Sequence, residues 1–69
     1  MANGNNKQLE TPNLKVLSDQ IGYESLMNKK FSEYASQCGD TQLKNLFNES
    51  AQVHKQNFTN LKNYLDSHQ

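Results

Sequence analysis

The sequence predicts an all-α protein, an antiparallel hairpin of two helices, from three features of its 69 residues. Apolar residues recur at steps of three and four over two long segments, which is the repeat of a helix and not the alternation of a strand. Glycine and proline are rare within these segments, and Gly39 with Asp40 marks one break between them. Because this connection is very short, the helices must be antiparallel neighbours.

Residues 1–11 are predicted to be a flexible N-terminal tail. They are polar and contain one leucine, so they bury too little apolar surface to offset the entropy lost on ordering. Thr11 and Pro12 then mark a helix start, because threonine caps helices and proline suits their first position. The tail lacks the apolar centre of a signal peptide, so we expect cytoplasmic synthesis.

The first helix is expected over residues 13–38. Its apolar positions follow the helical repeat, at Leu14, Leu17, Ile21, Phe31, Ala35 and Cys38. Met27 widens this stripe on one side, and Gly22 weakens the helix by up to about 1 kcal/mol relative to alanine. Gly39 is expected to adopt the left-handed conformation that commonly follows a helix end.

The second helix is expected over residues 41–65, with Asp40 as its N-cap and residues 67–69 as a short C-terminal tail. The hairpin domain therefore covers residues 12–66. The predicted seam of this helix contains Leu43, Phe47, Ser50, His54, Asn57, Leu61 and Tyr64, flanked by Leu46, Ala51, Val53, Phe58 and Leu65. An apolar face this wide suits a helix that touches two neighbours, as in a bundle.

A hairpin of this size is expected to form a homodimer that completes a four-helix bundle. A core this small supplies about 3–5 kcal/mol, and only 33% of the residues are apolar. A lone hairpin would leave apolar side chains wet, and exposed apolar patches mark partner surfaces. We assign nine residues to the core and dimer face: Leu17, Ile21, Met27, Phe31, Leu46, Phe47, Val53, Phe58 and Leu61.

Charge and composition argue against several partners. Seven lysines balance seven acidic residues and the chain has no arginine, so a nucleic-acid partner is not expected. No apolar run approaches the roughly 20 residues of a membrane span, so a membrane is not expected as a partner either. Cys38 is the only cysteine, and we expect a small buried side chain there, with a link between two chains as the alternative.

Folding the helices back at the turn sets Leu17 near Leu61 and Phe31 near Phe47, but it sets Glu24 level with His54. The seam is therefore apolar at both ends and polar in the middle, with Asn28 and Asn57 close by. A buried carboxylate or imidazole is costly unless it is paired.

Three interpretations of this polar layer remain open. The first is a hydrogen bond or ion pair that fixes register. The second is a site for iron, manganese or zinc between subunits, with Glu24 and His54 as ligands. Di-metal bundles also use a glutamate three residues before each histidine, a position occupied here by Ala51. The third is a layer filled with water.

Four stretches, residues 17–24, 29–31, 38–44 and 51–58, share a pattern of helix positions that resembles small clostridial spore coat-like proteins related to the Coat F family. The resemblance implies a ferritin-like four-helix bundle and an association with endospores of anaerobic Gram-positive bacteria. It also implies metal on a glutamate of one helix and a Glu-x-x-His of the next. Here the glutamate and histidine are present and the second glutamate is not.

No serine–histidine–aspartate set, glycine-rich phosphate loop or cysteine metal motif is present, so we expect no enzymatic activity. The leading hypothesis is a structural protein of the endospore coat, which associates with itself and with other coat proteins. One alternative is a ferritin-like half-bundle that binds iron, manganese or zinc between subunits. A weaker alternative is an adaptor for another helical protein.

Overall fold

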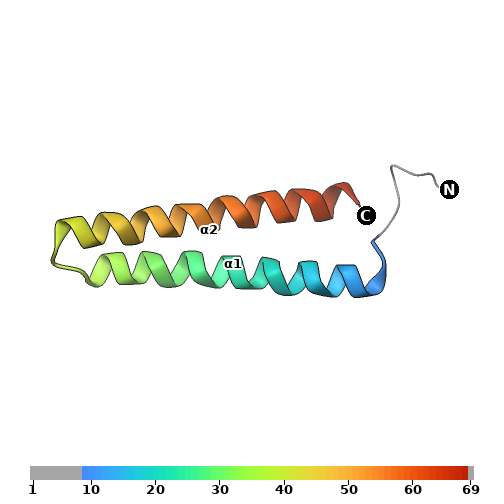
Figure 1. The fold of residues 1–69 in the computed structure, drawn as a ribbon, viewed down its shortest axis with the longest axis horizontal. Coiled ribbons are helices and arrows are strands. Elements are labelled where there is room, and N and C mark those ends of the chain that lie inside the picture. The colour runs from blue at the N-terminus through green and yellow to red at the C-terminus, as the bar shows by residue number, and fades with distance from the viewer. Residues whose placement is uncertain (1–8, 69) are drawn as a thin grey trace.

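The computed structural model describes residues 9–68, which form two long helices joined by a tight turn (Figure 1). Helix α1 spans Thr11–Gln37 and helix α2 spans Thr41–Ser67, 27 residues each. The helices run antiparallel and pack side by side along their length, so the end of α2 lies beside the start of α1 (Figure 1). The predicted all-α hairpin is therefore confirmed.

Helix α1 begins two residues earlier than predicted and ends one residue earlier. Thr11 is its first residue and belongs neither to a tail nor to a cap. The N-cap is Glu10, whose carbonyl oxygen accepts a hydrogen bond from the Leu14 amide at 2.9 Å, without a capping bond from its side chain. The rest of the predicted tail, residues 1–8, lies outside the described residues.

The turn differs from the prediction in its backbone conformation. Among residues 9–68 none has a positive φ, so the expected left-handed Gly39 is wrong. Cys38 ends α1 in an extended conformation, with φ −82° and ψ 132°, and its amide donates to the Ala35 carbonyl at 3.3 Å. Because the chain leaves the helix extended, the reversal needs no glycine, and a Cβ added at Gly39 would meet nothing within 4 Å.

Helix α2 has the N-cap that its sequence predicts. Oδ1 of Asp40 accepts a hydrogen bond from the Leu43 amide at 2.7 Å, which satisfies one of the free donors of the first turn. At its other end the helix continues to Ser67, two residues beyond the predicted range of 41–65. The predicted tail 67–69 is therefore partly helical, and its last residue lies outside the described part of the chain.

Two helices side by side form a single layer, and a single layer has almost no interior. Within the described chain only Ala35, Ala51 and Glu24 are buried, at 2%, 2% and 6% exposure. Of the nine residues assigned to the core and dimer face, Leu46 and Val53 are exposed, at 53% and 58%, and the other seven are half-buried. Neither helix is long and apolar enough to cross a membrane.

Candidate functional site

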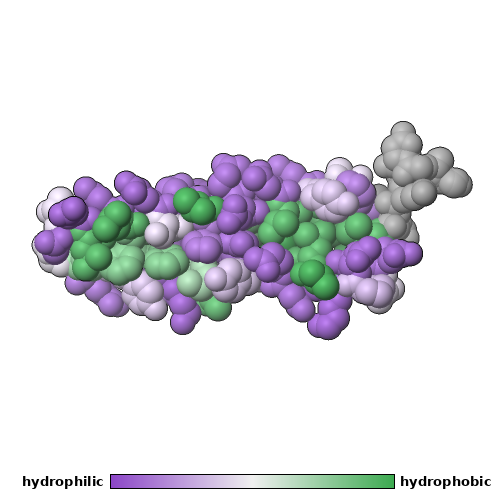
Figure 2. Space-filling model, viewed as in Figure 1, coloured by the Kyte–Doolittle hydropathy of each residue, from purple (hydrophilic) through white to green (hydrophobic). Residues whose placement is uncertain are grey.

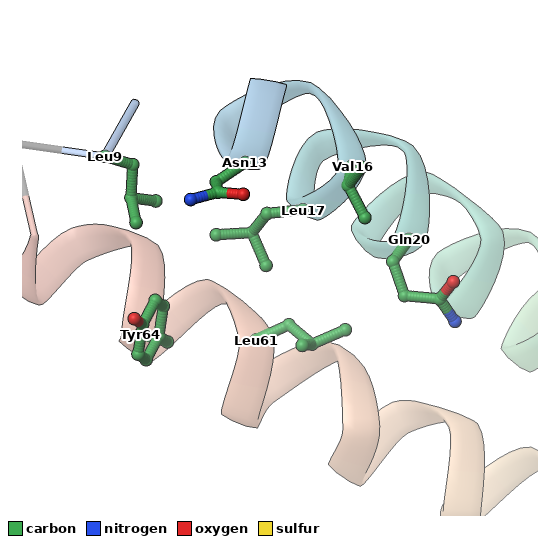
Figure 3. A pocket seen from close by; sticks show the side chains of 7 residues that line it. All are labelled: Leu9, Asn13, Val16, Leu17, Gln20, Leu61 and Tyr64. Carbon is green, nitrogen blue, oxygen red and sulfur yellow. The ribbon is translucent and has the colours of Figure 1, made fainter. Parts of the chain in front are cut away.

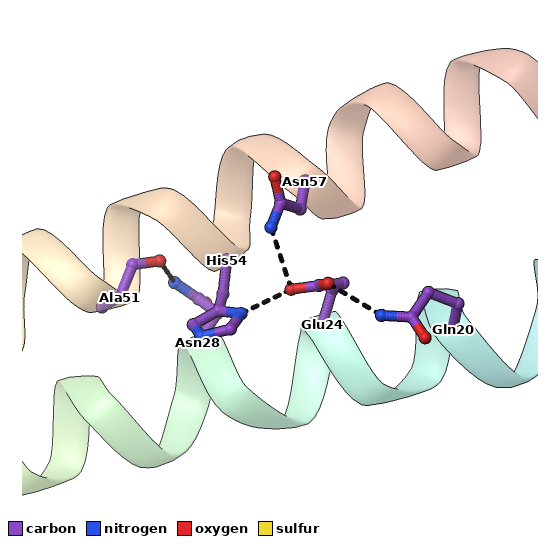
Figure 4. Close-up of polar contacts among 6 residues, drawn as sticks. All are labelled: Gln20, Glu24, Asn28, Ala51, His54 and Asn57. Atoms are coloured by element: carbon purple, nitrogen blue, oxygen red, sulfur yellow. Dashed lines mark hydrogen bonds and ion pairs between the residues drawn. The ribbon is translucent and has the colours of Figure 1, made fainter.

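The structure brings Glu24 and His54 together at the centre of the hairpin, as the sequence predicts. Each is the middle residue of its helix, and His54 Nδ1 lies 2.5 Å from Glu24 Oε1 (Figure 4). The side chains are 7% and 20% exposed, for the glutamate and histidine respectively. The histidine therefore points into the hairpin and not into solvent, and the polar layer exists.

Both carboxylate oxygens of Glu24 are occupied. Oε1 accepts from His54 and, at 3.4 Å, from Nδ2 of Asn57, while Oε2 accepts from Nε2 of Gln20 at 2.9 Å (Figure 4). The His54 hydrogen bond lowers the pKa of Glu24; burial opposes this, and the two amides add to the lowering. Gln20 was not predicted as part of this layer, although its place four residues before the glutamate on one helix allows the contact.

A second polar contact joins the helices one turn away. Nδ2 of Asn28 donates to the carbonyl oxygen of Ala51 at 2.8 Å (Figure 4). Among the described residues, every buried side-chain nitrogen or oxygen has a hydrogen-bond partner. The polar layer is thus fully satisfied, which removes the main cost of burying it.

Aromatic rings enclose the histidine. The His54 ring stacks on Phe31 with centroids 5.5 Å apart and planes 8° apart, and Tyr23 meets it edge-on at 6.0 Å. Phe31 also stacks on Phe47 at 6.0 Å, as the fold-back predicts. These contacts restrict rotation of the imidazole and hold Nδ1 toward the carboxylate.

The geometry limits how this pair could hold a metal ion. Oε1 of Glu24 already accepts two hydrogen bonds, so one lone pair of Oε2 and Nε2 of His54 are what the pair has left to offer a metal ion. Within residues 9–68 of one chain, no three histidine, cysteine or acidic side chains lie close enough together to hold a metal ion as a group. Ala51 is buried against α1, which leaves no room there for the missing glutamate.

Comparisons with protein-family models, with characterised proteins and with solved structures found no match for this chain. The protein is therefore described by its fold and its central pair alone. It is a two-helix hairpin with a fully hydrogen-bonded glutamate–histidine layer at its midpoint. The resemblance to the Coat F family stays a prediction from the sequence pattern.

Outside the polar layer, the hairpin carries two apolar patches, one over each half, with a hydrophilic band between them (Figure 2). Each half has a shallow groove. The groove near the turn is lined by Tyr34, Gln37, Cys38 and Phe47. The groove at the open end is lined by Leu9, Asn13, Val16, Leu17, Gln20, Leu61 and Tyr64 (Figure 3). Leu17 and Leu61 face each other across this groove, as the fold-back predicts, and Cys38 is half-buried in the other.

Proposed function

We propose that the chain is a non-enzymatic assembly protein, of the spore-coat type that its sequence pattern suggests. It acts by pairing with a second copy of itself to complete a four-helix bundle. One observation carries the proposal: of the nine large apolar side chains that are exposed in the described residues, five lie on one flat face of a single helical layer, namely Val16, Tyr23, Tyr34, Leu46 and Val53. Stable domains bury such faces between two layers, and the described residues 9–68 form one.

The two flat faces of the hairpin differ sharply in chemistry. In each helix, residues seven apart point in nearly the same direction around the helix axis. The positions on either side of the contact between the two helices can therefore be assigned from the sequence. We define the apolar face by Val16, Tyr23, Met27, Tyr34, Leu46 and Val53. The opposite, polar face carries Ser18, Ser25, Ser32, Lys15, Lys29, Lys55 and Lys62, together with Ala51, Phe58 and Leu65, which are buried or half-buried beside the helix contact. The first face leaves its large apolar side chains mostly exposed and the second does not, so the first gains more from leaving water.

The area available matches what a stable dimer needs. Two helices about 10 Å in diameter, lying side by side for about 40 Å, present about 800 Å² on each flat face. This is the area per partner of a standard protein interface. A second copy of the chain offers a face of the same size and the same apolar character, and a two-fold axis makes the contact self-complementary.

The mass of the chain in solution tests this proposal. Light scattering of the full chain at about 50 μM should give twice the monomer mass of 7.9 kDa. Leu46→Ser should raise the dimer dissociation constant by about 30-fold, since each copy loses about 1 kcal/mol of apolar burial. Leu26→Ser is the matched control, because Leu26 is similarly exposed, 49% against 53%, but lies on the outer edge of α1.

A wild-type chain that stays monomeric at this concentration would refute self-association and would favour the adaptor hypothesis. An equal effect of both leucine substitutions would show that the assigned face is wrong. The spore-coat part of the proposal is tested separately, by fractionating spores and vegetative cells of a sporulating source. Absence of the protein from purified spore coats would remove that part.

Metal binding between two copies is a second candidate, favoured by one observation. Glu24 accepts a hydrogen bond from one ring nitrogen of His54, the arrangement that often orients a metal-binding histidine. Protein purified without chelator and then offered iron, manganese or zinc should retain metal after desalting if this function is real. His54→Gln should then remove it. Metal content below one ion per dimer in the wild type would exclude it.

A further inference from the structure

The side of the hairpin that holds the apolar face also carries two charged residues, and they have opposite signs. On this side the flanking positions of both helices recur every seven residues. They are Asn13, Val16, Gln20, Tyr23, Met27, Lys30, Tyr34 and Gln37 in α1, and Gln42, Leu46, Glu49, Val53, Gln56, Asn60, Asn63 and Ser67 in α2. Lys30 is the one cation among them and Glu49 is the one anion.

These two charges stand at the same level of the hairpin but on its opposite edges. Glu24 and His54 mark a common level, because their side chains are in contact. Lys30 lies six residues and Glu49 five residues from that level, both toward the turn, which is about 9 Å and about 7.5 Å along the helix axes. Neither residue forms an ion pair within residues 9–68.

We propose that two copies pair through their apolar faces with both turns at the same end, and that two reciprocal ion pairs between Lys30 and the partner's Glu49 fix this arrangement. The inference rests on the proposed self-association and deepens it. A two-fold axis parallel to the long axis of the hairpin places α1 of each copy over α2 of the other. Each residue keeps its height along that axis. Lys30 of each copy then meets Glu49 of the other copy at the rim of the interface.

The apolar residues agree with the same arrangement. With the turns together, Tyr34 lies over the partner's Leu46, and Tyr23 lies over the partner's Val53. Amides also meet amides, since Gln20 lies over the partner's Asn60. Apolar side chains are therefore covered by apolar side chains at the level of the polar layer and toward the turn, while Val16 at the open end lies over the partner's Asn60 and Asn63.

The other two-fold arrangement, with the turns at opposite ends, lacks this match. Each α1 then lies over the partner's α1 with the levels reversed. Lys30 faces the uncharged stretch around Val16 and Gln20 of its partner. Leu46 faces the amides of Asn60 and Asn63. Because this arrangement leaves Lys30 and Glu49 without ion-pair partners at the rim, the charges select between the two arrangements.

A distance between the two turns tests the arrangement. Gly39→Cys in a Cys38→Ser background offers one labelling site at the tip, where the backbone has no positive φ and an added Cβ meets no atom within 4 Å. Spin labels on the two tips should lie within about 25 Å, given helix layers about 10 Å apart. A separation of about 40 Å, one helix length, would overturn the proposal while leaving the dimer intact.

Charge exchange supplies an independent test in the full chain. Lys30→Glu and Glu49→Lys should each raise the dimer dissociation constant roughly tenfold, because each creates two like-charge contacts. The double exchange Lys30→Glu with Glu49→Lys should return it to within about threefold of wild type. Lys29→Glu, on the polar face, is the control for net charge and should leave it unchanged.

Additive losses in the double exchange would contradict the proposed ion pairs. Light scattering on the same samples separates the two levels of inference. A monomeric wild type would overturn the proposed function and this inference together. A dimer with distant tips or additive charge effects would overturn this inference alone.

Discussion

Phe31 is the side chain on which the turn half of the hairpin depends most. It stacks on His54 at 5.5 Å and on Phe47 at 6.0 Å, and it meets Tyr34 edge-on at 5.9 Å. The Phe31→Ala substitution removes all three contacts at once. It also opens one side of the polar layer to water, because the ring covers a flat face of the imidazole.

The loss can be estimated from the surface that the ring covers. A half-buried phenylalanine removes roughly 120 Å² from water, worth about 3 kcal/mol at about 25 cal/mol per Å². The ring pairs add about 0.5 kcal/mol or more, and the open side of the hairpin keeps any cavity cost small. A core of this size supplies only about 3–5 kcal/mol in total. The midpoint of thermal unfolding should therefore fall by about 15 °C or more.

Thermal and urea unfolding followed by circular dichroism measures this loss, at one fixed protein concentration because a dimer gains stability with concentration. Phe31→Leu is the control that keeps most of the apolar area and loses only the ring stacking, so it should cost less than half as much. A loss below about 1 kcal/mol for the alanine variant would refute the reasoning, because the ring would then contribute little burial.

Two further predictions concern Asp40 and Glu24. Asp40→Ala should cost about 1 kcal/mol, or about 4–8 °C in Tm, by removing the acceptor of the Leu43 amide. An equal loss in the exposed Asp66→Ala control would contradict the capping role. Because the pKa of Glu24 is lowered in the fold, its carboxylate should stabilise fully above about pH 4.3, where an unfolded glutamate ionises, and lose this contribution as pH falls through the lower folded pKa. Urea unfolding should show that Glu24→Gln lacks this part of the acid sensitivity, and matching pH profiles of the two proteins would count against it.

The cross-helix contacts could be predicted from the sequence because the turn is so short. In a hairpin with a three-residue connection, residues equidistant from Gly39 lie opposite each other. That rule pairs Glu24 with His54 and Phe31 with Phe47, and both pairs are in contact. Long helical periodicity and one break thus determine both the fold and the register of the central site.

The helix ends and the bonding of the polar layer could not be predicted in the same way. The choice between Glu10 and Thr11 as the N-cap of α1 depends on a free-energy difference of about 1 kcal/mol. The sequence pattern does not predict a difference this small. The extended exit at Cys38 makes the glycine after it unnecessary, although glycine usually indicates a left-handed cap. Gln20 is a neutral side chain on the flank of its helix, and only the side-chain geometry shows that it donates to Glu24.

The polar layer selects the register of the two helices within one chain. Sliding one helix by seven residues past a neighbour would set Glu24 against Phe47 or Leu61, leaving a carboxylate on an apolar surface. Within one chain the short turn already prevents that slide. In the proposed dimer no covalent link holds the two copies in register. Glu24 is already paired within its own chain, so in the proposed dimer the register of the second copy is set by Lys30 and Glu49, which a shift along the helices would separate.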